Sequence, residues 1–115
     1  MKMRAILLKA DENEFVEVEI DTNKGLEDYY KYLECSCFDI QTVDFLGIKM
    51  SLFVDDEATF KSGNIAFESK LFNEYLIGNI LFLGGVDSEG NTLELPKEVV
   101  CGDLKANISV YGIVE

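Results

Sequence analysis

One segment of the chain alternates strictly between apolar and acidic residues, over positions 15–21 with the sequence FVEVEID. Val16, Val18 and Ile20 fall on one face of an extended strand, because successive strand side chains point to opposite faces. The opposite face carries Glu17, Glu19 and Asp21. This pattern predicts a strand with one buried and one solvated face, which is typical of antiparallel sheets. The apolar run at residues 4–9 precedes it across a polar turn, so we expect a hairpin.

The other segments predict short strands and short helices. Expected strands cover residues 37–45, 48–55, 79–85, 92–95 and 107–114. In the first of these, Phe38, Ile40 and either Thr42 or Val43 are expected to face inward. Expected helices cover residues 25–35, 65–78, and 96–104 with Pro96 at its first position. With 115 residues, the chain is expected to form a single α+β domain over residues 1–115, mainly an antiparallel sheet with two or three short helices.

The expected helix at residues 25–35 is amphipathic. Its apolar stripe recurs at helical spacing and consists of Leu26, Tyr29, Tyr30 and Leu33. Asp21, Thr22 or Asn23 is available as its N-cap. We expect Tyr29 and Tyr30 to be half-buried on this stripe, and the alternative is that they and Tyr32 anchor a partner surface.

The charge balance restricts the partners that this chain can bind. Against 10 basic residues stand 22 acids, a net charge of −12, which repels nucleic acid and anionic membranes and attracts basic surfaces. No apolar run is long enough for a membrane helix and no export signal is recognised, so a cytoplasmic location is expected. The three cysteines are then expected to stay reduced, with Cys35 and Cys37 as small buried apolar residues.

The order of these segments resembles the DUF3846 family of small bacterial and phage proteins. The similarity covers about residues 4–92, and its landmarks are residues 19–21, Leu26, residues 54–57 and residues 78–85. The chain departs from the family pattern at ECSCF, where members have Gly-Gly-Tyr, and at Ala58, where they have a turn glycine. The family has no assigned chemistry. The resemblance implies an accessory protein of phages or mobile elements, of a type expected to modulate host machinery.

Two acidic motifs resemble sites of metal-dependent chemistry. Asp55 or Asp56, followed by Glu68 and Lys70, has the spacing of a magnesium-dependent nuclease core. A Glu-x-Lys is expected about once by chance in such a chain. If residues 65–78 are helical, Glu68 and Lys70 also face apart. Residues 87–98 resemble a calcium loop but carry Thr92 where the required glycine belongs, so a hairpin turn is the better interpretation.

Catalysis by other routes lacks its parts. The chain has no histidine and no phosphate-binding glycine loop, and its Cys-x-Cys lacks the four ligands that zinc needs. We therefore expect a protein that is not an enzyme and has no cofactor or metal.

The leading hypothesis is an acidic accessory protein that inhibits a nucleic-acid-binding host protein by imitating DNA. Its candidate contact residues are Glu17, Glu19, Asp21, Asp55, Asp56, Glu57, Asp87 and Glu89. The strand row alone has a spacing of about 6.8 Å, against one charge per about 1.7 Å of duplex DNA, so several elements have to contribute. The alternative is a scaffold domain that forms oligomers, such as a homodimer, through a sheet edge.

Overall fold

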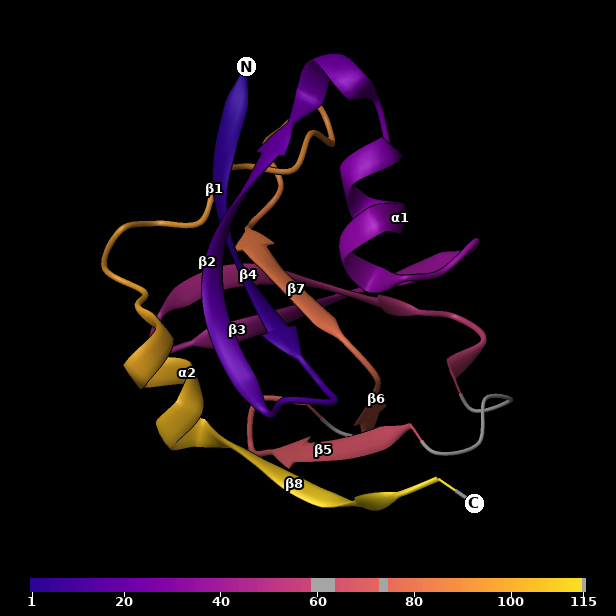
Figure 1. Cartoon of the computed structure of the whole chain (residues 1–115). Helices are drawn as coiled ribbons and strands as arrows, with labels where there is room; N and C mark the ends of the chain where they lie inside the picture. Colours follow the sequence, from indigo (N-terminus) through magenta and orange to yellow (C-terminus); the bar gives the residue numbers. More distant parts are fainter. Residues whose placement is uncertain (59–63, 73–74, 115) are drawn as a thin grey trace.

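A computed structural model describes residues 1–58, 64–72 and 75–114 of the chain (Figure 1). The first hairpin forms as its alternation predicts, because β1 (Lys2–Lys9) pairs antiparallel with β2 (Glu14–Asp21). Leu7 lies opposite Val16 and Ala5 lies opposite Val18. Both pairs therefore lie on one face of the hairpin, whereas Glu17 and Glu19 lie on the other.

In the described part of the chain, five antiparallel strands make the main sheet, in the order β2-β1-β7-β4-β3. Its other members are β3 (Phe38–Phe45), β4 (Ile48–Asp55) and β7 (Ile80–Gly84). β7 is remote from β1 in the sequence but lies between β1 and β4, and its residues are buried throughout. Its continuous apolar run suits this central place, since both of its faces are covered. This architecture confirms the α+β class with a mainly antiparallel sheet.

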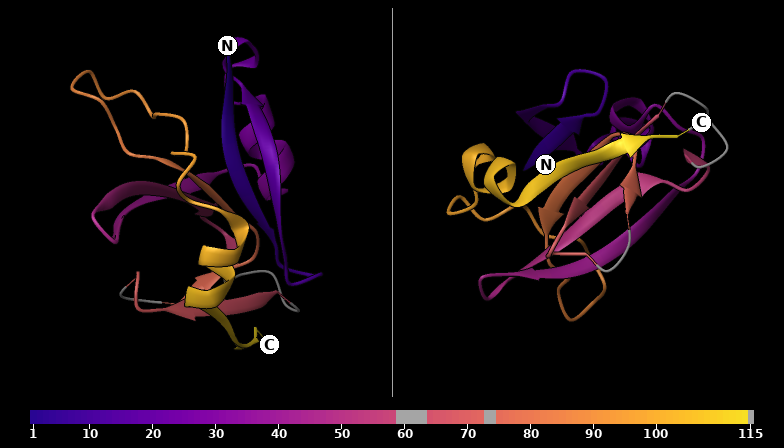
Figure 2. Two further views of the ribbon diagram at one scale, coloured as in Figure 1. Left: turned by 90° about the vertical axis from the view of Figure 1, so that its left-hand side faces the viewer. Right: turned by 90° about the horizontal axis from the view of Figure 1, so that it is seen from below.

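The main sheet has a hydrophobic core on each face. On one face, α1 (Glu27–Leu33) places Tyr29 and Leu33 against Leu7, Phe53 and other strand residues. A short 3₁₀ helix, η1 (Thr22–Lys24), precedes α1 and is capped by Asp21. The other face is covered by α2 (Cys101–Asn107) and a second sheet, whose strand order is β6-β5-β8 (Figure 2). The strands of this small sheet are β5 (Ile65–Ser69), β6 (Leu76–Ile77) and β8 (Ile108–Ile113).

The prediction of a helix at residues 65–78 is wrong, because two strands, β5 and β6, lie within this range. Its apolar residues also fit a strand at its start, and β5 pairs with β6 on one side and β8 on the other. Pairing with β8, whose residues lie 39 to 48 positions away along the chain, therefore decides between a helical and an extended pattern that the local sequence does not distinguish. Residues 73–74 of this segment, and 59–63 of the loop before it, lie outside the described residues.

Three smaller expectations also differ from the structure. Pro96 begins a turn, in which the Val99 N–H donates to the Pro96 carbonyl at 3.0 Å, and α2 begins only at Cys101. Residues 92–95 form no regular strand, although the Leu93 N–H donates to the Gly85 carbonyl at 2.8 Å. In β3, Ile40 is exposed because α1 does not reach that far along this edge strand.

The buried positions of β3 belong to the opposite face. Val43 is inward as one of the two options predicts, and Phe45 joins it in the core that faces the small sheet. Thr42 is exposed. Within the described residues, no helix has the length and apolar character needed to cross a membrane.

Candidate functional site

β2 lies at the edge of the main sheet and pairs with β1. In Figure 1 it lies at the front of the molecule, between α2 and α1. Because its two faces carry different residues, the surfaces on either side of this edge differ in chemistry. Each of these surfaces is hollowed.

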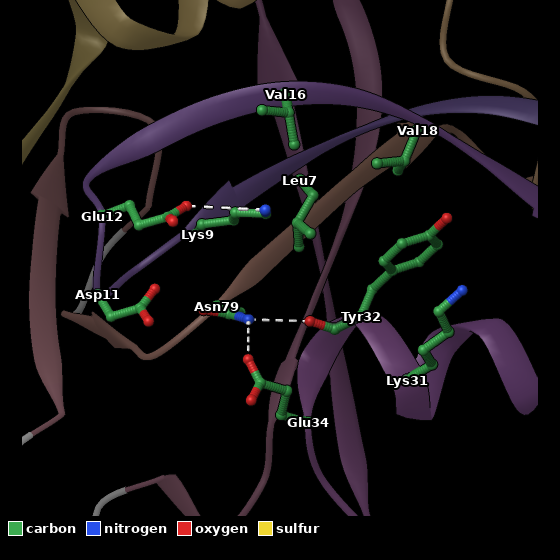
Figure 3. A pocket seen from close by; sticks show the side chains of 10 residues that line it. All are labelled: Leu7, Lys9, Asp11, Glu12, Val16, Val18, Lys31, Tyr32, Glu34 and Asn79. Atoms are coloured by element: carbon green, nitrogen blue, oxygen red, sulfur yellow. Dashed lines mark hydrogen bonds and ion pairs between the residues drawn. The ribbon is translucent and has the colours of Figure 1, made fainter.

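The hollow on the α1 side, here called the apolar groove, has a volume of about 440 Å³ (Figure 3). Leu7, Val16 and Val18 form its floor, and the Tyr32 ring forms a wall beside Val18. Val16, Val18 and Tyr32 are only half-buried, because α1 is short and covers the inner strands more fully than β2. The rim is charged, and its members are Lys9, Asp11, Glu12, Lys31 and Glu34.

Asn79 fixes the floor of this groove relative to the helix. Its Oδ1 accepts the Ala10 N–H at 2.9 Å, which holds the end of β1. Its Nδ2 donates to the Tyr32 carbonyl at 2.9 Å and to Glu34 Oε2 at 3.1 Å, which holds the end of α1 (Figure 3). One amide side chain just before β7 therefore sets the spacing between the hairpin and the helix.

The hollow on the α2 side, here called the acidic groove, has a volume of about 470 Å³ and is lined by Glu17, Glu19 and Glu94 beside Arg4. Arg4 Nε donates to Glu17 Oε1 at 2.9 Å. The rest of the guanidinium is also engaged, since Nη1 donates to the Pro96 carbonyl at 2.9 Å and Nη2 to that of Val99 at 2.8 Å. Glu94 Oε1 accepts the Arg4 backbone N–H. Glu19 makes no ion pair within the described residues.

Further acids gather at the end of the sheet where β1, β4 and α1 all finish. A depression of about 280 Å³ is lined there by Asp11, Glu34 and Asp55, together with Asn79. Asp55 is nearly buried and accepts the Glu57 N–H at 2.9 Å, so it shapes the turn after β4. Asp56 lines the adjoining depression with Asp55. The apolar groove and this acidic end share Asp11, Glu34 and Asn79, which makes them neighbours.

Asp87 and Glu89 lie at the opposite end of β7 from Asp55. The strand pairing places Val54 beside Ile80 and Met50 beside Gly84, so the length of β7 separates the two groups. Four strand steps span about 13 Å at the usual rise. Asp87 Oδ1 accepts the backbone N–H groups of Glu89 and Asn91, each at 2.9 Å, and builds the turn expected there.

The eight candidate contact residues are therefore not gathered in one region. Glu17 and Glu19 line the acidic groove, Asp55 and Asp56 lie at the acidic end, and Asp87 and Glu89 are remote from both. Asp21 accepts the Asn23 N–H at 3.0 Å and caps η1. Glu57 lies in the turn after β4 with its backbone N–H bonded to Asp55.

The Glu-x-Lys of the candidate metal motif does not lie on a helix. Glu68 lies on β5 and Lys70 follows in the next turn, so the expectation that they face apart on a helix is wrong. They line a depression with Asn107 and Ser109, whereas Asp55 and Asp56 line another. Among the described residues, no group of three or more histidine, cysteine, aspartate or glutamate side chains is placed to hold a metal ion.

The cysteines are free thiols, and their burial differs from the expectation. Cys35 is half-buried against the core beneath α1. Cys37 is exposed, so the expectation of two buried cysteines is wrong for this residue. It precedes β3 at the sheet edge, where α1 has already ended.

A family model supplies the wider context. The family described as "Domain of unknown function (DUF3846)" matches residues 3–107. The chain belongs to this family. The resemblance inferred from the order of the segments is thereby confirmed over most of the chain. Comparisons with curated proteins and with solved structures find no match.

Several residues of this surface are not apparent from the sequence. Arg4, Glu94 and Asn79 lie far apart in the chain and meet the site only through strand order. Tyr32, one of the three tyrosines that the sequence offers as partner contacts, lies in the wall of the apolar groove. The detectable signal for the groove was the alternation in β2, which already separates an apolar from an acidic face.

Proposed function

We propose that this DUF3846 protein acts by binding a basic, nucleic-acid-binding host protein through the acidic surface around β2, as an accessory protein of phages or mobile elements. The observation that carries the proposal is the gathering of acids from several elements around one edge strand. Among the described residues that line the two grooves, six are carboxylates and three are cations: Asp11, Glu12, Glu17, Glu19, Glu34 and Glu94, against Arg4, Lys9 and Lys31.

The cations of this surface are largely engaged within the protein. Arg4 is bonded to Glu17 and to two backbone carbonyls. Lys9 lies 3.7 Å from Glu12, and the Lys31 ammonium lies 5.2 Å from the centre of the Tyr32 ring. An approaching basic surface therefore meets an excess of negative charge, which speeds association and favours basic partners over acidic ones. Inhibition follows if the contacted residues are those that bind nucleic acid.

The proposal is tested by competition. Purified basic DNA- and RNA-binding proteins are bound to labelled nucleic acid, and release of the label is followed as this protein is added. We expect release at low ionic strength that weakens steeply as salt rises, because exposed charges are screened beyond about 8 Å at physiological salt. Release that is absent at every salt concentration would contradict the proposal.

The charge-reversal variants are chosen from the ion pairs. Glu19→Lys changes a carboxylate that has no ion pair within the described residues, and we expect it to weaken competition about tenfold. Glu89→Lys makes the same change in net charge at the remote end of β7 and is expected to have a much smaller effect. Glu17→Lys is unsuitable because it would place a cation against Arg4. Equal effects of the two variants would show that only net charge matters.

The scaffold alternative is favoured by a different observation, the edge strand β8. This strand is uncharged, and its exposed side chains include Val110, Tyr111 and Ile113. Val110 lies opposite Phe67 and Ile113 opposite Ile65, so both continue the core-facing side of the small sheet beyond its edge. Tyr111 stacks on Tyr75 with ring centroids 3.9 Å apart. Two copies could pair through β8 without electrostatic repulsion between the two strands, because neither strand carries a charged side chain.

Sedimentation equilibrium tests this alternative directly. A homodimer through β8 is expected to dissociate in Val110→Lys, because the pairing would bury an ammonium on each copy. Leu46→Lys is the matched control, since Leu46 is an exposed apolar residue in the β3–β4 turn, which belongs to the main sheet and not to the sheet of β8. A wild-type protein that remains monomeric at high concentration would exclude the scaffold role of β8.

A further inference from the structure

The outer edge of β2 presents a row of backbone hydrogen-bonding groups that no neighbouring strand pairs with in the described part of the chain. The contacts of Arg4 show which residues of β2 these groups belong to. The Arg4 N–H donates to Glu94 Oε1 at 2.8 Å, and its carbonyl accepts the Leu95 N–H at 3.0 Å. Both groups therefore point away from β2. Since backbone groups alternate in direction along a strand, the Ala5 groups point toward β2 and bond to Val18, which lies opposite.

The β2 residues that alternate with these bonded ones must direct their backbone N–H and C=O groups away from β1, toward the open edge of the sheet. They are Glu17 and Glu19, whose partners across the ladder are Ile6 and Arg4. Asp21 continues the same series, and its N–H donates to Asp28 Oδ2 at 2.8 Å instead of bonding to β1. Within the described residues no other strand pairs with this edge. The outward N–H and C=O groups of Glu17 and Glu19 are thus available to an added strand.

A strand added to this edge would meet a different chemistry on each side. Its side chains alternate, so every second one would lie over the apolar groove, on Val16, Val18 and the Tyr32 ring. The others would lie over the acidic groove, near Glu19 and Glu94. Apolar residues fit the first side and cationic residues the second.

We propose that β2 binds an extended segment of the partner as a sixth strand of the main sheet, and that this segment alternates apolar and basic residues. The inference rests on the proposed function and specifies the segment that the acidic surface recognises. Main-chain hydrogen bonds to Glu17 and Glu19 supply affinity, and the two grooves supply selectivity for the alternating pattern.

A second copy of this chain does not fit the same edge. Pairing of β2 with β2 would bring the glutamates of one copy beside those of the other, and like charges on neighbouring strands are destabilising. An acidic or uncharged strand would leave Glu19 and Glu94 without compensation in the acidic groove. Charge complementarity therefore selects a basic segment.

The first test compares two synthetic peptides of the length of β2. One alternates valine and lysine, and the other has the same composition with all valines before all lysines. We expect the alternating peptide to bind at least about tenfold more tightly, since only it satisfies both grooves and the ladder. Hydrogen exchange should slow at the amides of Glu17 and Glu19 when it binds. Equal affinities without this protection would overturn the inference.

The second test separates backbone pairing from charge. Glu19→Pro and Glu19→Thr both remove the carboxylate, but only proline removes the outward N–H, and proline is tolerated on edge strands. We expect Glu19→Pro to bind the alternating peptide about tenfold more weakly than Glu19→Thr, with an unchanged fold by circular dichroism. If the two variants bind equally, no strand is added at β2. Val18→Lys places a cation in the apolar groove and should also weaken binding.

The two proposals fail in distinguishable ways. If basic proteins compete in a salt-dependent manner but the alternating peptide leaves the β2 amides unprotected, the strand-addition inference is overturned and the acidic-surface function stands. If neither basic proteins nor either peptide bind at low salt, both proposals are overturned.

Discussion

At the scale of the residue, Arg4 connects three parts of the chain through one side chain. Its guanidinium bonds Glu17 on β2 and the carbonyls of Pro96 and Val99, and its side chain is mostly buried. These contacts hold the segment before α2 against the hairpin, where Leu95 and Val99 enter the core. The planar, multiply donating guanidinium suits such a position, and an ammonium does not.

We therefore expect Arg4→Lys to lower the free energy of unfolding by about 1–3 kcal/mol, because carbonyls are left unpaired at a partly buried site. Urea denaturation measures the change. Lys9→Met is the control, since the exposed Lys9–Glu12 pair is separated by 3.7 Å. Its loss should cost about 0–1 kcal/mol. Equal losses in the two variants would show that the Arg4 contacts add nothing to the fold.

Substitution of two glycines, Gly84 and Gly102, by alanine is expected to change the stability in opposite directions. A Cβ on Gly84 would lie 2.4 Å from the Glu94 carbonyl oxygen, so the close approach of residues 93–94 to β7 requires glycine. A Cβ on Gly102, within α2, meets no atom within 4 Å. Gly84→Ala should lower stability by more than about 2 kcal/mol by forcing backbone apart. Gly102→Ala should raise it by up to about 1 kcal/mol. Thermal unfolding of both variants checks the opposite signs.

At the scale of the element, the turn after β7 is organised by one carboxylate. Asp87 accepts backbone N–H groups from Asn91 and Glu89, and the ladder closes between Val86 and Thr92. These hydrogen bonds, that from Asn91 foremost, hold the pKa of Asp87 below its ordinary value of 3.8. The charged form is therefore the one that stabilises the folded turn.

The pH dependence follows from this direction. Because the folded-state pKa of Asp87 is depressed, its stabilisation is present above the unfolded pKa of 3.8 and is lost as the pH falls through the folded value. We expect an NMR titration to give a midpoint for Asp87 below 3.8. Asp87→Asn should make the acid side of the stability curve shallower. A midpoint above the ordinary value would contradict the role given to the backbone donors.

Over the molecule as a whole, the net charge of −12 is distributed on a fold with few ion pairs between its described residues. The described residues contain three: Arg4–Glu17, Lys9–Glu12 and Lys24–Asp28. Most acids therefore repel one another across the surface, and this repulsion is relieved when the chain expands. We therefore expect the acidic surface proposed to bind a partner to lower the stability of the free protein.

Added salt should consequently stabilise the folded state. We expect the midpoint of thermal unfolding to rise by a few degrees between about 0.01 M and 0.15 M sodium chloride, as the screening length shortens from about 30 Å to 8 Å. Circular dichroism at matched protein concentration measures it. A falling midpoint would mean that the ion pairs outweigh the repulsion.

Elements with a local and unambiguous residue pattern could be predicted from the amino-acid sequence. The alternation at residues 15–21 predicted β2, its hairpin and the separation of an apolar from an acidic face, because strand geometry leaves no other arrangement for it. The stripe ending at Leu33 likewise predicted the helix that became α1. The turn at Asp87 followed from residues that bond to their own neighbours.

Features that depend on residues far apart in the chain could not be predicted from local patterns and are known from the fold. Residues 65–69 form a strand because β8 pairs with them. Their apolar pattern is compatible with both a helix and a strand, so it does not predict this pairing. The same holds for the site, since strand order brings Glu94 beside Arg4, and Asn79 between Ala10 and Glu34. The local backbone sets the direction of a side chain. The residues that it contacts depend on which strands pack side by side in the folded protein.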